Sequence, residues 1–244
     1  SAREIIRELK STKYLDSIKV NLALAKSKIK NFRYYLDYIS VQEPHLSDGV
    51  LKEMNPLAKT YFYYLFELGQ VKKLSKLLRK NAQIDYHAIN EEEFYYNILS
   101  MLAILNQNFE YALECLQKAE KHAGAVNNHY AITVFYISEI ECFIGLKDYV
   151  KAEEVIQKTM EIASQYKYHY WMSKLRLLKA IINLANPRYP VRSILRELLD
   201  LRNDIISNEY FLLNVKLQNL LFRVYLSYGA ELEALEAFQD YKKL

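Results

Sequence analysis

The chain has 244 residues, of which five are Gly and four are Pro, whereas average composition gives roughly 12% for the two together. Because tight turns and phosphate-binding loops depend on glycine, this scarcity excludes β-sandwiches, propellers and doubly wound sheets. Hydrophobic residues make up 51% and charged residues 25%, which indicates a globular, helical protein. The net charge of +4 is the balance of +7 over residues 1–90, −7 over 91–165 and +4 over 166–244. This distribution is compatible with separate partners, with curvature that brings opposite charges together, or with no functional role.

The cysteines and the hydropathy indicate a reducing, aqueous compartment. Cys115 and Cys142 allow at most one disulfide, far fewer than a small secreted scaffold carries. The longest mainly apolar stretch, residues 94–105, includes Asn97 and is too short and too polar to cross a bilayer. No secretory signal opens the chain. We therefore predict a cytoplasmic protein without membrane contact and, because the chain begins at Ser1 rather than Met, a segment of a longer protein.

A short link recurs along the chain with a nearly constant period. The positions five residues after the start of each link are spaced by 39, 38, 40, 41 and 41 residues. These anchor positions are Tyr35, Leu74, Ala112, Ala152, Ser193 and Ala234. A period of this length predicts an array of repeats, each one a pair of helices.

Apolar residues recur at helical spacing on both sides of every anchor, which predicts two helices in each unit. Small anchors allow the two helices to approach closely, and we expect Phe109 and Tyr149, three residues earlier, to pack over that contact. Asn90, followed by three glutamates, predicts a helix start. Pro187 and Pro190 flank a loop that ends a helix of the fifth unit.

A stripe of basic residues lies on one predicted helix of the second unit, opposite an apolar face. The stripe consists of Lys72, Lys73, Lys76, Arg79 and Lys80. Such a surface suits nucleic-acid phosphates or an acidic protein, and it equally suits a plain solvated face. No helix-turn-helix accompanies it. We therefore expect nucleic-acid contact only weakly through this patch, or through a domain outside the chain.

Runs of consecutive aromatic residues occur at residues 61–64 and 94–96, and the run 168–171 includes one histidine. Consecutive helical residues point about 100° apart, so the rings of one run cannot all face a single core. Tyrosine has an apolar ring and a polar tip and is therefore suited to interfaces. Some of these rings are predicted to line an interface, a groove or a concave wall, while the others pack between repeats.

No catalytic motif is present: the chain lacks a nucleophile elbow, a phosphate-binding loop, a zinc-protease helix and a Cys-x-x-Cys pair. Cys115 and His122 could share a helix face, but no third or fourth zinc ligand accompanies them. We expect a protein that is not an enzyme and that carries no cofactor.

The stretch from Tyr96 to Ala119 resembles a tetratricopeptide repeat. The residues at its signature positions are Tyr96, Leu99, Ser100, Ala103, Phe109, Ala112, Leu116 and Ala119. The next unit resembles it less fully, with Ile140 and Thr159 where small residues are usual. The ordinary tetratricopeptide period is about 34 residues, and HEAT-like two-helix repeats have about 40–47. Longer helices around a tetratricopeptide-like core account for the intermediate spacing of this chain. Over residues 12–244 the pattern is similar to the repeat domains of bacterial signal-responsive regulators, of the maltose-regulator and peptide-pheromone-receptor types.

The resemblance implies an all-α fold, a right-handed α-solenoid of about six antiparallel helix hairpins that forms one domain over residues 1–244. In tetratricopeptide arrays the first helix of each pair lines a concave surface where peptides bind. The corresponding residues of this chain are Asn21, Lys28, Lys59, Tyr63, Asn97, Met101, Glu141, Lys179, Asn219 and Arg223. Asparagine suits an extended peptide because its amide both donates and accepts.

These observations lead us to expect a non-enzymatic domain that binds a protein or a peptide. By resemblance it is the sensor or interaction segment of a bacterial transcription regulator, in which ligand binding shifts the packing of the repeats. The alternative is a scaffold subunit of a stable multiprotein complex. A homodimer is compatible with both.

Overall fold

The structure, a computed structural model, describes residues 62, 63, 65–67, 69–80, 92–125, 128–208 and 210–243. The regular secondary structure within these ranges is helical and includes no strand, so the predicted all-α class is confirmed for this part of the chain. Contacts divide the chain into two compact units, Ser1–Asp85 and Tyr86–Leu244. A single domain over residues 1–244 stays a prediction.

The described part of the first unit centres on α5 (Val71–Lys80), which buries Leu74 and Leu77 on one face. A tight turn precedes it. The amide of Gly69 donates to the carbonyl of Phe66, and the amide of Gln70 donates five residues back, both at 2.8 Å. Gly69 has φ +64, a left-handed conformation that glycine adopts without steric cost.

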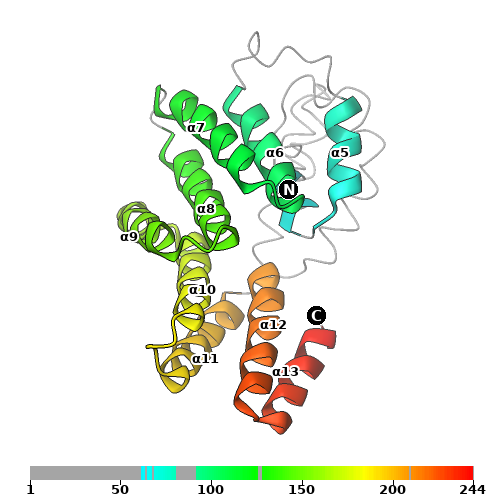
Figure 1. Ribbon diagram of the computed structural model, residues 1–244, viewed down its shortest axis with the longest axis vertical. Helices are drawn as coiled ribbons and strands as arrows, with labels where there is room; N and C mark the ends of the chain where they lie inside the picture. The colour runs from blue at the N-terminus through cyan, green and yellow to red at the C-terminus, as the bar shows by residue number, and fades with distance from the viewer. Residues whose placement is uncertain are drawn as a thin grey trace, which may run out of the picture. The chain divides into compact units, whose positions relative to one another are not determined.

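The second unit is a succession of helices in which each packs against the next along the chain (Figure 1). They are α6 (Glu92–Leu105), α7 (Phe109–Ala125), α8 (His129–Gly145), α9 (Tyr149–Gln165), α10 (His169–Ala185), α11 (Val191–Ser207), α12 (Phe211–Tyr228) and α13 (Glu231–Lys243). Alternate helices also meet, because α6 contacts α8, α8 contacts α10, and α10 contacts α12. We call α6, α8, α10 and α12 the first helices, and α7, α9, α11 and α13 the second helices.

First and second helices differ in how much of their surface is buried. In α8 the six consecutive residues 133–138 are all buried, which covers every side of the helix. In α9 the buried residues form a single stripe, Ala152, Ile156, Thr159 and Ala163. A stripe of this kind is typical of a helix with one face on a core and the other in water. α8 is therefore enclosed by its neighbours, whereas α9 packs on the core with one face only.

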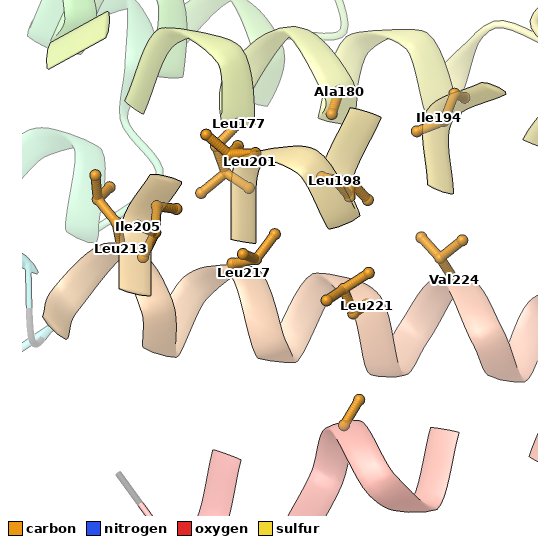
Figure 2. Packing of buried hydrophobic residues seen from close by; sticks show 11 residues of the cluster. Leu177, Ala180, Ile194, Leu198, Leu201, Ile205, Leu213, Leu217, Leu221 and Val224 are labelled. Atoms are coloured by element: carbon orange, nitrogen blue, oxygen red, sulfur yellow. The ribbon is translucent and has the colours of Figure 1, made fainter. Parts of the chain in front are cut away.

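One continuous core joins α10, α11 and α12 (Figure 2). Leu177 and Ala180 of α10 face a row on α11 that includes Leu198, and that row in turn meets Leu213 and Leu217 of α12. Truncating a fully buried leucine such as Leu198 to alanine costs about 2–5 kcal/mol, so this core is a main source of the stability of the unit.

The helix starts recur at intervals of 20 residues, with Asn108, Asn128, Asp148 and Tyr168 directly before α7, α8, α9 and α10. The side chain of Asn128 accepts a hydrogen bond from the amide of Ala131 at 3.1 Å, and Asp148 caps α9 in the same way. Such caps satisfy amides that the helix itself leaves free.

The recurring link of the sequence is a helix-ending turn. Gln107 and Lys147 both have φ +61, and Gly229 has φ +74. In the first two turns the next amide donates five residues back, from Asn108 to Ala103 and from Asp148 to Phe143, at 2.9 Å. This is the geometry that commonly closes helices. Because the turn is stabilised by its own residues, it repeats wherever the link does.

The fifth link departs from the expected register. Ser193 was the expected anchor, but it is only half-buried, whereas Ile194 is 1% exposed and occupies the core. The reason is the loop before α11. After the left-handed residues Gly69, Gln107, Lys147 and Gly229 the next helix begins two residues later. By contrast, α11 begins at Val191, three residues past the start of the fifth link at Arg188, because Pro190 precedes it. Every later position of α11 is therefore shifted by one.

The ring of Phe109 packs against the end of α8. A Cβ added to Gly145 would lie 2.3 Å from the Cζ atom of this ring, so the absent side chain at Gly145 makes room for it. We expected Phe109 to pack over the contact within its own helix pair. The structure shows that it contacts the next pair at Gly145, while packing within its own pair stays a prediction.

Lys147→Gly should raise the free energy of unfolding by about 0.5–1 kcal/mol, because glycine relieves the cost of a left-handed residue. Lys121→Gly, at an exposed position inside α7, should lower it by about 1 kcal/mol. Urea denaturation followed by circular dichroism measures both. Equal losses in the two variants would contradict a strained turn at Lys147.

Candidate functional site

Four of the predicted concave contacts belong to the first unit. Asn21, Lys28 and Lys59 lie outside the described residues. Tyr63 is described and is half-buried. These four contacts therefore stay predictions.

Two further predicted contacts lie inside the core. Asn97 is 1% exposed and Met101 is 0% exposed. Both belong to α6, which packs against α7 and α8. Neighbouring helices therefore cover both side chains in this structure, and their contact with a ligand stays a prediction.

Glu141 takes part in an ion pair between two first helices. Its carboxylate on α8 lies 3.0 Å from the ammonium of Lys174 on α10, which is only 3% exposed. The same ammonium lies 5.9 Å from the ring centroid of Trp171. A buried lysine needs such partners, since removing an ion from water costs several kcal/mol. The pair therefore connects α8 to α10.

The remaining predicted contacts of the second unit lie nearer the surface. Lys179 of α10 is half-buried, while Asn219 and Arg223 of α12 are exposed. The latter two are four residues apart and so lie on the same face of α12. These two side chains are accessible to a ligand.

The basic patch is on the surface, as its pattern indicates. The side chains of Lys72, Lys73, Lys76 and Arg79 are exposed on α5, opposite its buried face. Lys80 ends α5, and its side chain lies outside the described part.

The most distinctive surface of the second unit is a chain of aromatic rings, each in contact with the next. We call it the aromatic ladder. In order of contact it consists of His129, Tyr166, Tyr168, Tyr130, Trp171, Tyr170 and Tyr210. These rings come from the starts of α8 and α10, from the turn before α10, and from the residue before α12. The ladder therefore runs across the N-terminal ends of three successive first helices.

The ring geometry changes along the ladder. His129, Tyr166 and Tyr168 are stacked in sequence, with centroids 4.7 and 5.7 Å apart. Tyr130 meets Tyr168 edge-on at 5.5 Å. Tyr170 then stands nearly perpendicular to its two neighbours, 4.9 Å from Trp171 and 5.2 Å from Tyr210. Each perpendicular pair leaves a ring face beside a ring edge, which is a favourable arrangement for aromatic contacts.

The ladder occupies positions that other helices of the chain use for capping. Tyr168 and Tyr210 precede α10 and α12 with nearly the same backbone angles as Asp148 before α9, but neither makes a side-chain cap. An Asn or Asp at such a position stabilises a helix by about 1 kcal/mol. Local rules of this kind are most often broken where a residue serves a function.

Part of the ladder faces water. Tyr130 is 51% exposed and Tyr166 is 38% exposed, while Tyr168 and Trp171 are half-buried. Enclosure of its hydroxyl raises the pKa of Tyr130, and a hydrogen bond with Trp171 opposes this shift. Ring surface of Tyr130 and Tyr166 therefore stays accessible.

A polar network joins α7, α8 and α9 away from the ladder. The hydroxyl of Tyr136 donates to Glu120 at 2.5 Å, and the ammonium of Lys158 donates to the same hydroxyl. Burial, and then the charge of Glu120, raises the pKa of nearby Glu139, while Lys158 lowers it. Burial is also the largest cause of the raised pKa of Tyr136.

The thiols are buried and free. Burial raises the pKa of Cys142 to about 12 and also raises that of Cys115. Both therefore remain protonated at neutral pH, and a thiolate is the reactive form of cysteine. Within the described ranges, no three His, Cys, Asp or Glu side chains are grouped closely enough to hold a metal ion. His122 instead pairs with Glu92 at 2.8 Å.

Among the helices that the structure describes, none is both long and apolar enough to cross a bilayer.

The aromatic runs pointed to only part of the ladder. The run 168–171 supplied three of its tyrosine and tryptophan rings, but Tyr130, Tyr166 and Tyr210 stand outside every run. A signal was present in the repeat, since Tyr130, Tyr170 and Tyr210 are spaced by exact multiples of 40 residues. Nothing in the sequence indicated that Lys174 pairs with Glu141, because an apolar helix face around a lysine does not reveal the partner of that lysine.

A scan of protein-family models and searches of curated proteins and of solved structures find no match for this chain.

Lys174→Met should lower the free energy of unfolding by about 3 kcal/mol, because it leaves Glu141 without its partner in a mostly buried position. The double variant with Glu141→Leu should recover part of this loss. The matched control is the exposed pair Arg176 and Asp204, where Arg176→Gln should cost no more than about 1 kcal/mol. Chemical denaturation of the unchanged chain and of these three variants measures the free energy of unfolding of each. Equal costs at the two pairs would contradict a buried ionic link.

Glu139→Gln should stabilise the protein at neutral pH. Since the pKa of Glu139 is raised in the folded state, the stability from its protonated form is present below pH about 4.5 and lost as pH rises through the raised pKa. The advantage of the variant should therefore grow with pH across that interval. Thermal denaturation between pH 4 and 8 measures it, and a constant advantage at every pH would indicate packing instead of titration.

Proposed function

We propose that the second unit is a tetratricopeptide-like α-solenoid of antiparallel helix pairs that binds a protein or peptide ligand and performs no chemistry of its own. The observation that carries this proposal is the aromatic ladder, which crosses the ends of three successive first helices. A surface shared by several repeats suits an extended ligand.

Support for the solenoid comes from the order of the contacts. Each helix packs on the next, and the first helices also contact one another from α6 to α12. The links have the same closing turn at Gln107, Lys147 and Gly229. Stacking of one repeated unit on its neighbour is the architecture that such a pattern predicts.

Support for a protein or peptide ligand comes from the chemistry of the ladder. Tyr and Trp are enriched among residues that dominate binding energy, because they bury a large rigid ring and keep a polar tip. Tyr130 and Tyr166 have exposed ring surface, and the ammonium of Lys174 lies 5.9 Å from the ring centroid of Trp171. The rings are therefore held ready for contact, which lowers the entropic cost of binding.

By its resemblance to the repeat domains of bacterial regulators, the chain is proposed to be the sensor or interaction segment of a cytoplasmic transcription regulator. A ligand on the ladder contacts α8, α10 and the start of α12 together. It therefore favours one relative arrangement of these helices over others, and a change in that arrangement is the signal passed to an output domain or to a second copy of the chain.

The test is selection from a display library of random heptapeptides, followed by affinity and melting-temperature measurements on the chain. Tyr130→Ala combined with Tyr166→Ala should weaken the selected peptides by at least about 30-fold, the loss typical of binding hot spots. The control is Tyr228→Ala combined with Tyr189→Ala, since these rings are 51% and 42% exposed but lie outside the ladder. The control should change affinity by less than about threefold.

Peptides that bind both variants equally well would place the ligand elsewhere on the chain. A library that yields no peptide able to raise the melting temperature would contradict a peptide ligand altogether. In that case a chain that is soluble only with a co-expressed partner would favour the scaffold role.

A further inference from the structure

The exposed face of α5 is occupied by cations alone. Lys72, Lys73, Lys76 and Arg79 are its exposed residues, while the apolar side chains Leu74 and Leu77 are buried. Lys72, Lys76 and Arg79 lie on one line along the helix, and Lys73 lies beside it. From Lys72 to Arg79 the stripe extends over about 10 Å at 1.5 Å per residue.

These cations are not paired with carboxylates in the described part of the chain. None of the four forms an ion pair with any residue that the structure describes, and α5 itself contains no acidic residue. In the second unit Lys151, Lys174 and Arg202 are each paired with a carboxylate. The positive field of the α5 face is therefore directed to solvent, where it attracts anions.

The composition of this face distinguishes between classes of anionic partner. Protein interfaces contain an apolar or aromatic centre in which water is excluded, and charged residues are depleted there. The α5 face offers no such centre, because its leucines point into the core. Binding to a nucleic-acid backbone needs only cations placed against phosphates, and its affinity comes from the release of counterions.

Among nucleic acids, the duplex fits the charge spacing best. Double-stranded DNA carries one negative charge per about 1.7 Å of its axis, so a stripe of about 10 Å meets several phosphates at once. Three of the four cations are lysines, which act as mobile point charges and do not impose the fixed fork geometry of arginine. Such contacts hold the backbone without reading bases.

We propose that the exposed face of α5 is a sequence-independent docking surface for the phosphate backbone of duplex DNA. This function goes beyond the peptide binding proposed for the second unit and does not depend on it. It would hold the protein on DNA without selecting a site, leaving the choice of sequence to another element.

The experiment is fluorescence anisotropy of the chain with a labelled 20-base-pair duplex of arbitrary sequence, between about 25 and 200 mM KCl. The logarithm of the affinity should fall with the logarithm of salt concentration with a slope of about −2 to −4, since each phosphate contact contributes about −0.9. A second duplex of unrelated sequence should give the same curve within about twofold.

The variant combines Lys72→Gln, Lys73→Gln, Lys76→Gln and Arg79→Gln. It should lose at least about tenfold in affinity at 50 mM salt and most of the salt slope. The matched control removes the same number of exposed charges elsewhere, by Lys121→Gln, Lys147→Gln, Arg192→Gln and Arg196→Gln. The control should retain the slope and most of the affinity. The double variant Lys72→Gln and Lys76→Gln removes half of this charge and should give a salt slope between those of the unchanged chain and the fourfold variant. It tests the same surface if the fourfold variant unfolds.

Three results would overturn the proposal. One is the absence of binding at 25 mM salt. Another is an equal loss of affinity in the variant and in the control, which would reflect total charge and not this face. The third is competition by poly-glutamate or by anionic lipid vesicles at lower charge concentration than duplex DNA, which would assign the surface to an acidic protein or to a membrane.

Discussion

The enclosure of α8 is the constraint on which the rest of the second unit depends. Because α8 is buried on every side, each polar group on it must find a partner inside the protein, since an unpaired buried group is costly. This explains why Glu141 and Lys174 pair between α8 and α10. On α6, Asn97 and Met101 are likewise buried. With the sides of α8 covered, its exposed ring surface lies at its N-terminal end, where Tyr130 is 51% exposed.

The residues that precede these helices differ along the chain. Asn128 and Asp148 cap α8 and α9 in the expected way, but tyrosines stand at the same position before α10 and α12. A helix that gives up its cap loses about 1 kcal/mol, and the ladder returns part of this through ring contacts worth about 0.5–1.5 kcal/mol each. The rings of the ladder thus stabilise one another, while Tyr130 and Tyr166 keep exposed ring surface. The uncompensated cations of α5 are a second surface, of a different chemistry, which suits a different partner.

The links and helices were predictable because their causes are local. A left-handed residue followed by a bond five residues back depends only on neighbours in sequence, so Gln107, Lys147 and Gly229 end helices in the same way. The exposure of the basic stripe was predictable for the same reason, because Leu74 and Leu77 mark the opposite face. The register of α11 was not, since the prolines of the preceding loop displaced the buried position from Ser193 to Ile194. The ladder was only partly predictable, because contacts between Tyr130, Trp171 and Tyr210 join residues that are far apart in the chain.

The sequence by itself determined that the described part of the chain is helical, where its repeating links fall, and which face of α5 is charged. These properties follow from periodicity and from turn chemistry, which act over a few residues. Only the tertiary structure decided which apolar faces are covered by which neighbours, that Lys174 is buried against Glu141, and that seven rings meet in one row. The physical reason is that an apolar helix face shows that it will be buried but not against what, and the partner is set by the packing of helices distant in the chain.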